Sequence, residues 1–361
     1  MPAKSPRKPA RKRGKSSGNT KKILISFGII LLVSFLIACA YFYGKVFKPN
    51  LTLDGTGPNF VYIKSTDSFQ DVVNHLSSRG MLKNRESFIW MAEFLKYTEN
   101  VKPGRYKVTD RMNNKQLVLL LRSGRQEPVR VTFQNMRSRE ELGGKIGKIL
   151  EADSVSLLEI MNDKGMMAEY GLTPKTALSL FLPDTYEFYW STPASVFISR
   201  MGKEYLKFWT DERKAKALAL NLSPSEVSIV ASIVQQESNQ PEEWPVISGV
   251  YLNRLKKGMK LQADPTVKYA VGDFTLRRIR SNHLKVDSPY NTYKYAGLPP
   301  GPIYLASKRC MDSVLTTRPH SYLYFCARAD RSGYHFFATT FEQHLQNARK
   351  YQRELNQRGV E

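Results

Sequence analysis

The chain has 361 residues, of which 42% are hydrophobic and 11% aromatic, and its 55 Lys and Arg outweigh 32 Asp and Glu to give a net charge of +23. This length and apolar content exclude a wholly disordered protein and predict about two domains. Three Cys exclude a disulfide-stapled scaffold, and the five His lack metal-binding spacing, so we expect no metal site and no other cofactor.

The first 22 residues form a basic tail with nine Lys or Arg and no acid. The 21 residues that follow, 23–43, carry no charge. A helix of that length spans about 30 Å, the thickness of the hydrocarbon core of a bilayer. Positive charge before a span predicts that the tail is cytoplasmic and that the rest of the chain lies outside. We therefore expect one transmembrane helix. We expect the basic tail to set the orientation of the helix and to contact anionic lipid headgroups, and not to bind nucleic acid.

The three Cys leave alternatives open. Residues 36–39 (LIAC) resemble a lipobox, which would make Cys39 a lipidated N-terminus. The apolar run continues past Cys39 and the basic lead is long, which favours an uncleaved anchor. Outside the membrane, Cys310 and Cys326 could form a disulfide in an oxidising compartment, although two buried free thiols are the favoured prediction.

Residues 44–60 contain Gly and Pro and little periodicity, which predicts a linker. Residues 61–135 alternate strand and helix signals and predict a small α+β module. Its strands are expected at 61–63, 104–108 and 129–133, and its helices after Asp67 as N-cap, over 86–97 and over 114–121.

Residues 136–357 predict a larger, mixed α/β domain. Three helix starts are expected from capping residues, at Ser138, at Thr192 with Pro193, and at Ser223 with Pro224 and Glu226. The C-terminal third predicts a helix near 307–316, a hairpin over 322–338 and a last helix from Thr340.

Glu237 is the most informative acid in the chain. On a helix through 227–237, Val230, Ile233 and Val234 lie within about 60° of Glu237, so its carboxyl belongs to the apolar face. Apolar surroundings disfavour the charged form and raise the pKa of a carboxyl, which suits a general acid. A Glu exposed at a fraying helix end is the alternative.

Other acids have simpler interpretations. Asp264 precedes Pro265 and is expected to cap a helix. Glu242 and Glu243 follow a Pro and are expected to be solvated. A conventional glycosidase needs two carboxylates beside the scissile bond, and Asp264 would be the first candidate for the second one.

Five motifs in order carry a family resemblance. They are residues 231–237 (ASIVQQE), 251–255 (YLNRL), 261–267 (LQADPTV), 290–293 (YNTY) and 297–303 (GLPPGPI). Together with the apolar N-terminal segment they resemble the endolytic murein transglycosylases of the MltG, or YceG-like, family. The match covers about residues 23–355.

The resemblance implies a single-pass inner-membrane protein with a LysM-like module at 61–135 and a periplasmic YceG-like catalytic domain. It implies cleavage of the MurNAc–GlcNAc β-1,4 bond inside nascent peptidoglycan strands without water, which leaves a 1,6-anhydroMurNAc end. The catalytic Glu of the family falls on Glu237, which would act as acid and then as base. Peptidoglycan synthases are candidate partners.

Within the matched motifs, the expected substrate-binding residues are Gln262, Asp264, Asn291 and Tyr293. Amide and hydroxyl groups beside aromatic rings suit a sugar. One departure is Gln235-Gln236, where many members carry an acid and a Lys. The competing hypotheses are a non-catalytic, membrane-anchored peptidoglycan-binding scaffold and a hydrolase that would leave reducing ends.

Overall fold

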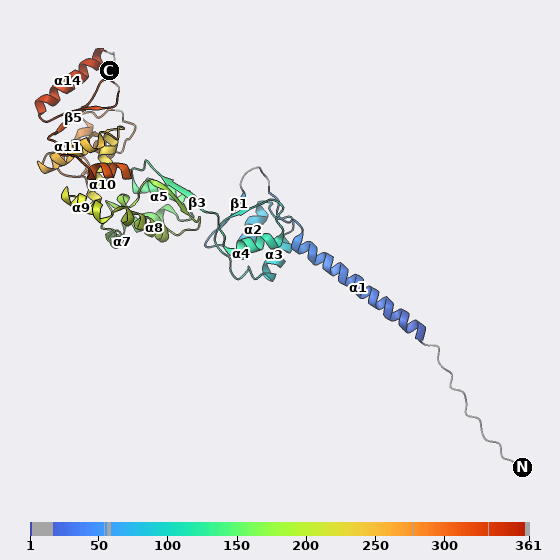
Figure 1. The fold of residues 1–361 in the computed structure, drawn as a ribbon. Helices are drawn as coiled ribbons and strands as arrows, with labels where there is room; N and C mark the ends of the chain where they lie inside the picture. The colour runs from blue at the N-terminus through green and yellow to red at the C-terminus, as the bar shows by residue number, and fades with distance from the viewer. Residues whose placement is uncertain (2–16, 54, 56–58, 277, 331, 358–361) are drawn as a thin grey trace. The chain divides into compact units, whose positions relative to one another are not determined.

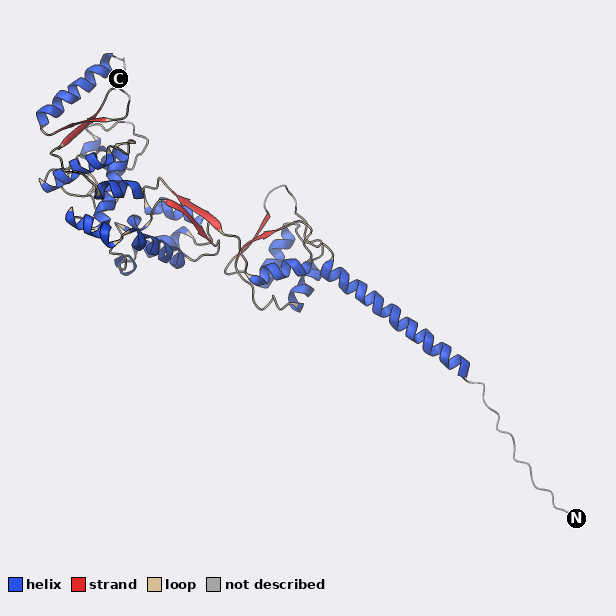
Figure 2. Ribbon diagram, viewed as in Figure 1, coloured by secondary structure: helices blue, strands red, loops and turns tan. Residues whose placement is uncertain are grey.

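The computed structural model describes residues 1, 17–53, 55, 59–276, 278–330 and 332–357 (Figure 1). The chain divides into two compact units, Met1–Glu127 and Pro128–Glu361. Most of the basic tail lies outside the described residues. The secondary structure is mixed, with helices and three two-stranded antiparallel sheets among the described residues (Figure 2). This confirms a mixed α+β fold.

The first unit begins with a long apolar helix, α1 (Ser17–Phe47). The part of this helix from Lys21 to Phe47 is long and apolar enough to cross a bilayer. Its most apolar stretch is not buried in the protein. The helix runs unbroken through Cys39 and continues to Phe47, into the segment expected to be a linker. Leu51, within that segment, is fully buried and bridges to Leu82, so this part of the expected linker packs onto the small unit.

The small unit closes around five short elements. They are β1 (Asn59–Ile63), α2 (Phe69–Ser78), α3 (Arg85–Phe94), β2 (Gly104–Val108) and α4 (Asn114–Ser123). The predicted elements are confirmed within a few residues, and β1 pairs antiparallel with β2. The N-cap of α2 is Ser68 and not Asp67, because the Ser68 hydroxyl accepts from the Asp71 amide while Asp67 accepts from the Lys64 amide.

The strand β3 (Val129–Phe133) lies in the second unit, although we expected it in the small module. It pairs antiparallel with β4 (Asp184–Phe188). The alternating residues Val129, Val131 and Phe133 are buried in the core of the second unit. Pairing between strands distant in sequence therefore places the boundary near Glu127.

The second unit is mostly helical. After β3 its elements are α5 (Arg139–Gly147), α6 (Ser154–Asn162), α7 (Lys164–Ala168), η1 (Ala177–Leu180), β4, α8 (Ala194–Phe208), α9 (Asp211–Ala219), α10 (Pro224–Glu237), α11 (Trp244–Lys256), α12 (Asp264–Val271), η2 (His283–Lys285), α13 (Lys308–Leu315), β5 (Tyr324–Ala327), β6 (His335–Ala338) and α14 (Phe341–Gln357).

The predicted helix starts are mostly confirmed. Ser138 caps α5, and Ser223 and Glu226 form a reciprocal capping box at α10. The start of α8 lies one residue later than expected. Pro193 is its N-cap residue, and the Thr192 hydroxyl donates to the Tyr189 carbonyl instead. Cys310 and Cys326 are free thiols, the first buried and the second partly buried.

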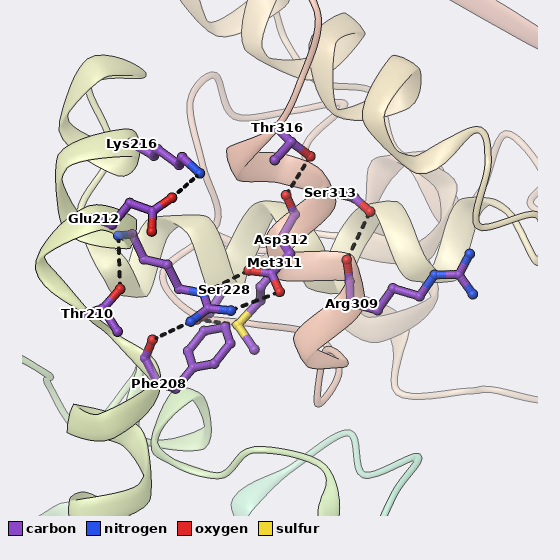
Figure 3. Close-up of polar contacts among 11 residues, drawn as sticks. Phe208, Thr210, Glu212, Lys216, Ser228, Arg309, Met311, Asp312, Ser313 and Thr316 are labelled. Atoms are coloured by element: carbon purple, nitrogen blue, oxygen red, sulfur yellow. Dashed lines mark hydrogen bonds and ion pairs between the residues drawn. The ribbon is translucent and has the colours of Figure 1, made fainter.

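α10 packs against α11 and α13, which also pack against each other. An ion pair braces this packing from α9, because the Arg213 guanidinium donates to both carboxylate oxygens of Asp312 on α13, at 2.8 and 3.1 Å. Figure 3 shows this cluster, in which the same guanidinium also reaches the Phe208 carbonyl and Ser228 of α10 contacts Met311 of α13. The result is a fixed frame around α10.

Candidate active site

α10 is held as a buried helix whose last residue is Glu237. The Ser223 hydroxyl accepts from the Glu226 amide, the Glu226 carboxylate accepts from the Ser223 amide, and Pro224 supplies a preset first turn. Every residue from Val227 to Val234 is buried. At about 1.5–3 kcal/mol for each fully buried Val or Ile, this burial fixes the helix firmly.

The carboxyl of Glu237 meets a tyrosine from the next helix. The Tyr251 hydroxyl donates to Glu237 Oε1 at 2.6 Å, and Tyr251 is itself 2% exposed. Glu237 is only partly buried, so solvent or substrate can approach it. The hydrogen bond fixes the position of one carboxyl oxygen.

The surroundings keep this carboxyl easy to protonate. Burial raises the pKa of Glu237 from its ordinary value of 4.5 to about 7, and the negative charge of Asp264 adds to the rise. The hydrogen bond from Tyr251 and the positive charges of Lys268 and Arg254 act in the opposite direction. Near neutral pH, Glu237 therefore exchanges a proton readily.

The motif that contains Tyr251 also anchors two loops. Arg254, on the same face one turn later, is 8% exposed and donates to the carbonyls of Leu261 and Leu323, at 2.8 and 2.7 Å. Its Nη1 also reaches Gln262 Oε1 at 3.3 Å. Asn253 donates to the carbonyls of His320 and Tyr322. One helix face thus positions Glu237 and the loop that carries Gln262.

Asp264 and Tyr293 face each other across two loops. The Tyr293 hydroxyl donates to Asp264 Oδ1 at 2.7 Å. Asp264 does not cap α12, contrary to expectation, because it is the first helical residue and Ala263 occupies the N-cap position. Asp264 and Gln262 are exposed, and Gln262 has a left-handed backbone with φ +51.

Buried threonines join these two loops. The Thr292 hydroxyl accepts from the Ala263 amide at 3.0 Å and lies 2.8 Å from the Thr266 hydroxyl. The Gln262 amide donates to the Thr292 carbonyl. Residues 261–266, at the start of α12, and the loop at 288–293 are therefore joined by buried hydrogen bonds.

Asn291 holds the second loop together from inside. It is fully buried, and its amide donates to the carbonyls of Leu284 and Val286, at 2.9 and 2.8 Å. Its Oδ1 accepts from the Tyr293 amide. The structure thus gives Asn291 a role in shaping the loop, and its contact with a substrate stays a prediction.

The family assignment rests on most of the chain. A comparison with protein-family models matches residues 61–350 to the YceG-like family. The chain belongs to the YceG-like family.

Relatives of known name agree with that assignment. The chain is 27% identical to an endolytic murein transglycosylase of Streptococcus pneumoniae over 92% of this chain and 66% of the relative. It is 26% identical to an endolytic murein transglycosylase of Bacillus subtilis, over 88% of this chain and 91% of the relative. The chain thus spans about two thirds of the streptococcal relative and most of the Bacillus relative.

A solved structure is also similar. The crystal structure of a putative YceG-like protein from Listeria monocytogenes matches 80% of this chain and 98% of that chain, with a TM-score of 0.53 and 27% sequence identity. The similarity therefore extends from sequence to fold.

The segment after Glu237 in this YceG-like chain is locked by a buried ionisable pair. Glu243 is 5% exposed and His335 of β6 is 9% exposed, and their side chains lie 2.7 Å apart. Glu243 also accepts from the His335 amide and from the Ser238 hydroxyl, at 2.8 and 3.1 Å. We expected Glu243 to be solvated, and this was wrong because long-range partners satisfy its carboxylate. Its neighbour Glu242 is exposed as expected.

The sequence reasoning missed several positioning residues. Tyr251 and Arg254 stand three apart on one helix, a spacing that could have shown a shared face. Gln235 is one of the two residues at which this chain departs from the family pattern. It accepts from the Ser307 amide at 2.8 Å and so links α10 to the start of α13. Glu243 and His335 are 92 residues apart, and no local signal links them.

A cavity of about 990 Å³ lies elsewhere in this unit. It is lined near the first half of α10 by Ser223 and Ile229, and on α11 by Gly249 and Asn253. Glu237 is not one of its lining residues. The cavity therefore does not include the carboxyl. Among the described residues, no group of three or more His, Cys, Asp or Glu could hold a metal ion.

Proposed function

We propose that this protein is a membrane-anchored endolytic lytic transglycosylase with Glu237 as its acid and base. The observation that carries the proposal is the Glu237 carboxyl, whose pKa is raised to about 7 by burial and which is held by Tyr251. The names of the relatives from Streptococcus and Bacillus support the same class of reaction.

The proposed reaction uses one carboxyl twice. Tyr251 engages Oε1, so the proton of Glu237 resides on Oε2 and passes to the glycosidic oxygen between MurNAc and GlcNAc. The carboxylate then takes the proton from the C6 hydroxyl of MurNAc as that oxygen attacks the anomeric carbon. The glycosidic bond breaks, the new C1–O6 bond forms, and a 1,6-anhydroMurNAc end remains. No water enters the balance.

We propose that the segments beside Glu237 form the sugar-binding surface. Gln262 and Asp264 are exposed, and Tyr293 presents an aromatic ring whose hydroxyl is bonded to Asp264. Asp264 supports the acid form of Glu237 through its charge. We propose that these three residues contact the glycan directly and that Asn291 shapes the loop from beneath.

We further propose that α1 spans the membrane, with the basic tail in the cytoplasm and both compact units outside it. Its length and hydropathy support the span, and the nine basic residues before it support the orientation. The small unit would then position glycan strands, as a LysM-like module does, near the membrane where new strands arise.

Glu237→Gln tests the proposal directly. Gln keeps an oxygen to accept from Tyr251 but cannot donate a carboxylic proton. We expect the full-length variant to lose activity by at least about 10²-fold, since general acid–base groups contribute 10²–10⁴-fold. Purified glycan strands are digested, and new ends are identified by mass spectrometry.

Glu242→Gln is the matched control, because Glu242 is a nearby acid with an exposed side chain. It should release anhydro ends at the wild-type rate. Equal release by Glu237→Gln and wild type would contradict catalysis by Glu237. Reducing ends in place of anhydro ends would indicate a hydrolase, and no release by the wild type would favour a binding scaffold.

A further inference from the structure

The end of α1 is built into the small unit by a buried polar network. Asn114 of α4 is 1% exposed and donates to the Lys45 carbonyl of α1 at 2.8 Å. The same amide donates to the Ser87 hydroxyl of α3, and its oxygen accepts from Asn50. Removing Asn114 from this network would leave several buried polar groups unpaired. The C-terminal end of α1, just after its apolar stretch, is therefore fixed to α3 and α4.

Aromatic side chains lie beside this attachment. We call Tyr41, Phe42 and Phe47 of α1 together with Trp90 and Phe94 of α3 the aromatic collar. The Phe42 and Trp90 rings lie 5.6 Å apart, and Trp90 stacks on Phe94 at 5.5 Å with an interplanar angle of 11°. Phe94 is 70% exposed. An aromatic stack of this kind is costly to leave in water.

The depth of the collar follows from the apolar run. That run ends at Tyr43, so a ring in contact with Phe42 lies within about one helical turn of the hydrocarbon boundary. Trp90 and Phe94 thus reach the level at which Trp and other aromatic side chains favour a membrane interface. Phe94 is exposed and Trp90 is half-buried, and lipid in place of water would cover the exposed parts of both rings.

Cations accompany the collar. Lys45 Nζ lies 4.7 Å from the centre of the Tyr41 ring and 5.5 Å from that of Trp90. Lys115 of α4 lies 5.7 Å from the centre of the Phe47 ring. Positive charge beside interfacial aromatic rings complements anionic phosphate headgroups.

We propose that the Trp90–Phe94 face of the small unit is embedded in the headgroup region of the leaflet from which α1 emerges. The unit then lies on the bilayer and does not move freely on a stalk. This inference rests on the proposed membrane span of α1. It identifies a lipid surface as the partner of an exposed protein face.

Quenching of tryptophan fluorescence by brominated lipid tests the inference. The full-length protein is placed in vesicles of phosphatidylethanolamine and phosphatidylglycerol that carry bromine either near the glycerol or near mid-chain. Trp90 is one of four tryptophans, and the others, Trp190, Trp209 and Trp244, belong to the second unit. We expect bromine near the glycerol to quench the fluorescence more strongly than bromine near mid-chain. The loss should equal about the contribution of one tryptophan to the total fluorescence, and Trp90→Phe should remove it.

A second variant tests the lipid contact without removing the reporter. Phe94→Asp should reduce the quenching of Trp90 at least twofold, because a charge is disfavoured in the interface. Leu218→Asp is the matched control on α9, where Leu218 is 74% exposed, and should leave the quenching unchanged. Both sites are exposed, so neither substitution removes a core contact.

Three outcomes would overturn the inference. Quenching that Trp90→Phe leaves intact would come from another part of the protein. A wild-type protein that resists a carbonate wash but shows no quenching of Trp90 would span the membrane without this contact. Release of the protein by the wash would refute both the membrane span and the lipid contact. That result would not bear on the proposed catalysis by Glu237.

Discussion

The two ends of α10 are held in different ways. At its start, Ser223 and Glu226 satisfy each other's backbone amides within one turn. At its end, Glu237 depends on Tyr251 from α11, and the next residue, Ser238, depends on Glu243 and through it on His335. The first end is a local device, and the second is assembled from distant parts of the chain.

This difference shows how a helix can carry a reactive group. A local cap makes the helix begin at a fixed residue with little help from its surroundings. At the far end, side chains from other elements set the position and the proton affinity of the Glu237 carboxyl. The contacts at the far end stabilise the unit and also tune the proton affinity of Glu237, whereas the local cap fixes only where the helix begins. The following variants test that contrast, from the largest effect to the smallest.

Removal of Glu243 should have the largest effect on stability. Glu243→Ala leaves the buried His335 ring, the His335 amide and the Ser238 hydroxyl without their acceptor, and each buried polar group left unpaired costs about 1–3 kcal/mol. Urea unfolding followed by tryptophan fluorescence, to which the buried Trp209 contributes, measures the loss. Glu242→Ala, at an exposed neighbour, should change stability by no more than about 0.5 kcal/mol. Equal losses in the two variants would refute the buried lock.

Glu237→Gln should change how stability depends on pH. The folded pKa of Glu237, about 7, exceeds its ordinary value of 4.5, so the folded state binds more protons between these values. The charged form of Glu237 is disfavoured in the folded state. The free energy of unfolding of the wild type therefore falls as pH rises through this window, by about 3 kcal/mol in total. The variant should gain stability relative to wild type from pH 5 to pH 8. A difference independent of pH would contradict the raised pKa.

Tyr251→Phe and Asp264→Asn should move the pH profile in opposite directions. In the proposed mechanism activity requires protonated Glu237, so we expect it to fall with rising pH through the pKa of that residue. Loss of the Tyr251 hydrogen bond raises the pKa and should move the falling limb up by about one pH unit, since such a bond to a charged group is worth about 1.5 kcal/mol. Loss of the Asp264 charge should move it down. Shifts of the same sign would show that these contacts do not set the proton affinity.

Ser223→Ala should have the smallest effect. It removes the N-cap of α10 and should cost about 1 kcal/mol, with no shift in the pH profile. Ser225→Ala, two residues later, should cost less than about 0.5 kcal/mol. A change in the pH profile with Ser223→Ala would mean that the two ends of α10 are coupled.

Much of the local structure was predictable because its causes lie within a few residues. The capping box at Ser223, the strands at 104–108 and 129–133, and the apolar face of α2 all appear where composition and spacing indicated. Errors arose where a distant partner competes with a local rule. Asp264 binds Tyr293 and does not cap α12, and β3 pairs with β4 across the expected domain boundary.

The candidate site divides in the same way. Amino-acid sequence alone determined the long apolar helix, the apolar surroundings of Glu237, and the resemblance to the YceG-like family, because periodicity, charge and motif order are properties of neighbouring residues. Tertiary structure alone decided that Tyr251 binds Glu237, that Asn291 is buried, and that Glu243 pairs with His335. Those contacts join residues 14 to 92 positions apart or depend on how a loop closes on itself, and no one-dimensional pattern specifies which distant groups meet.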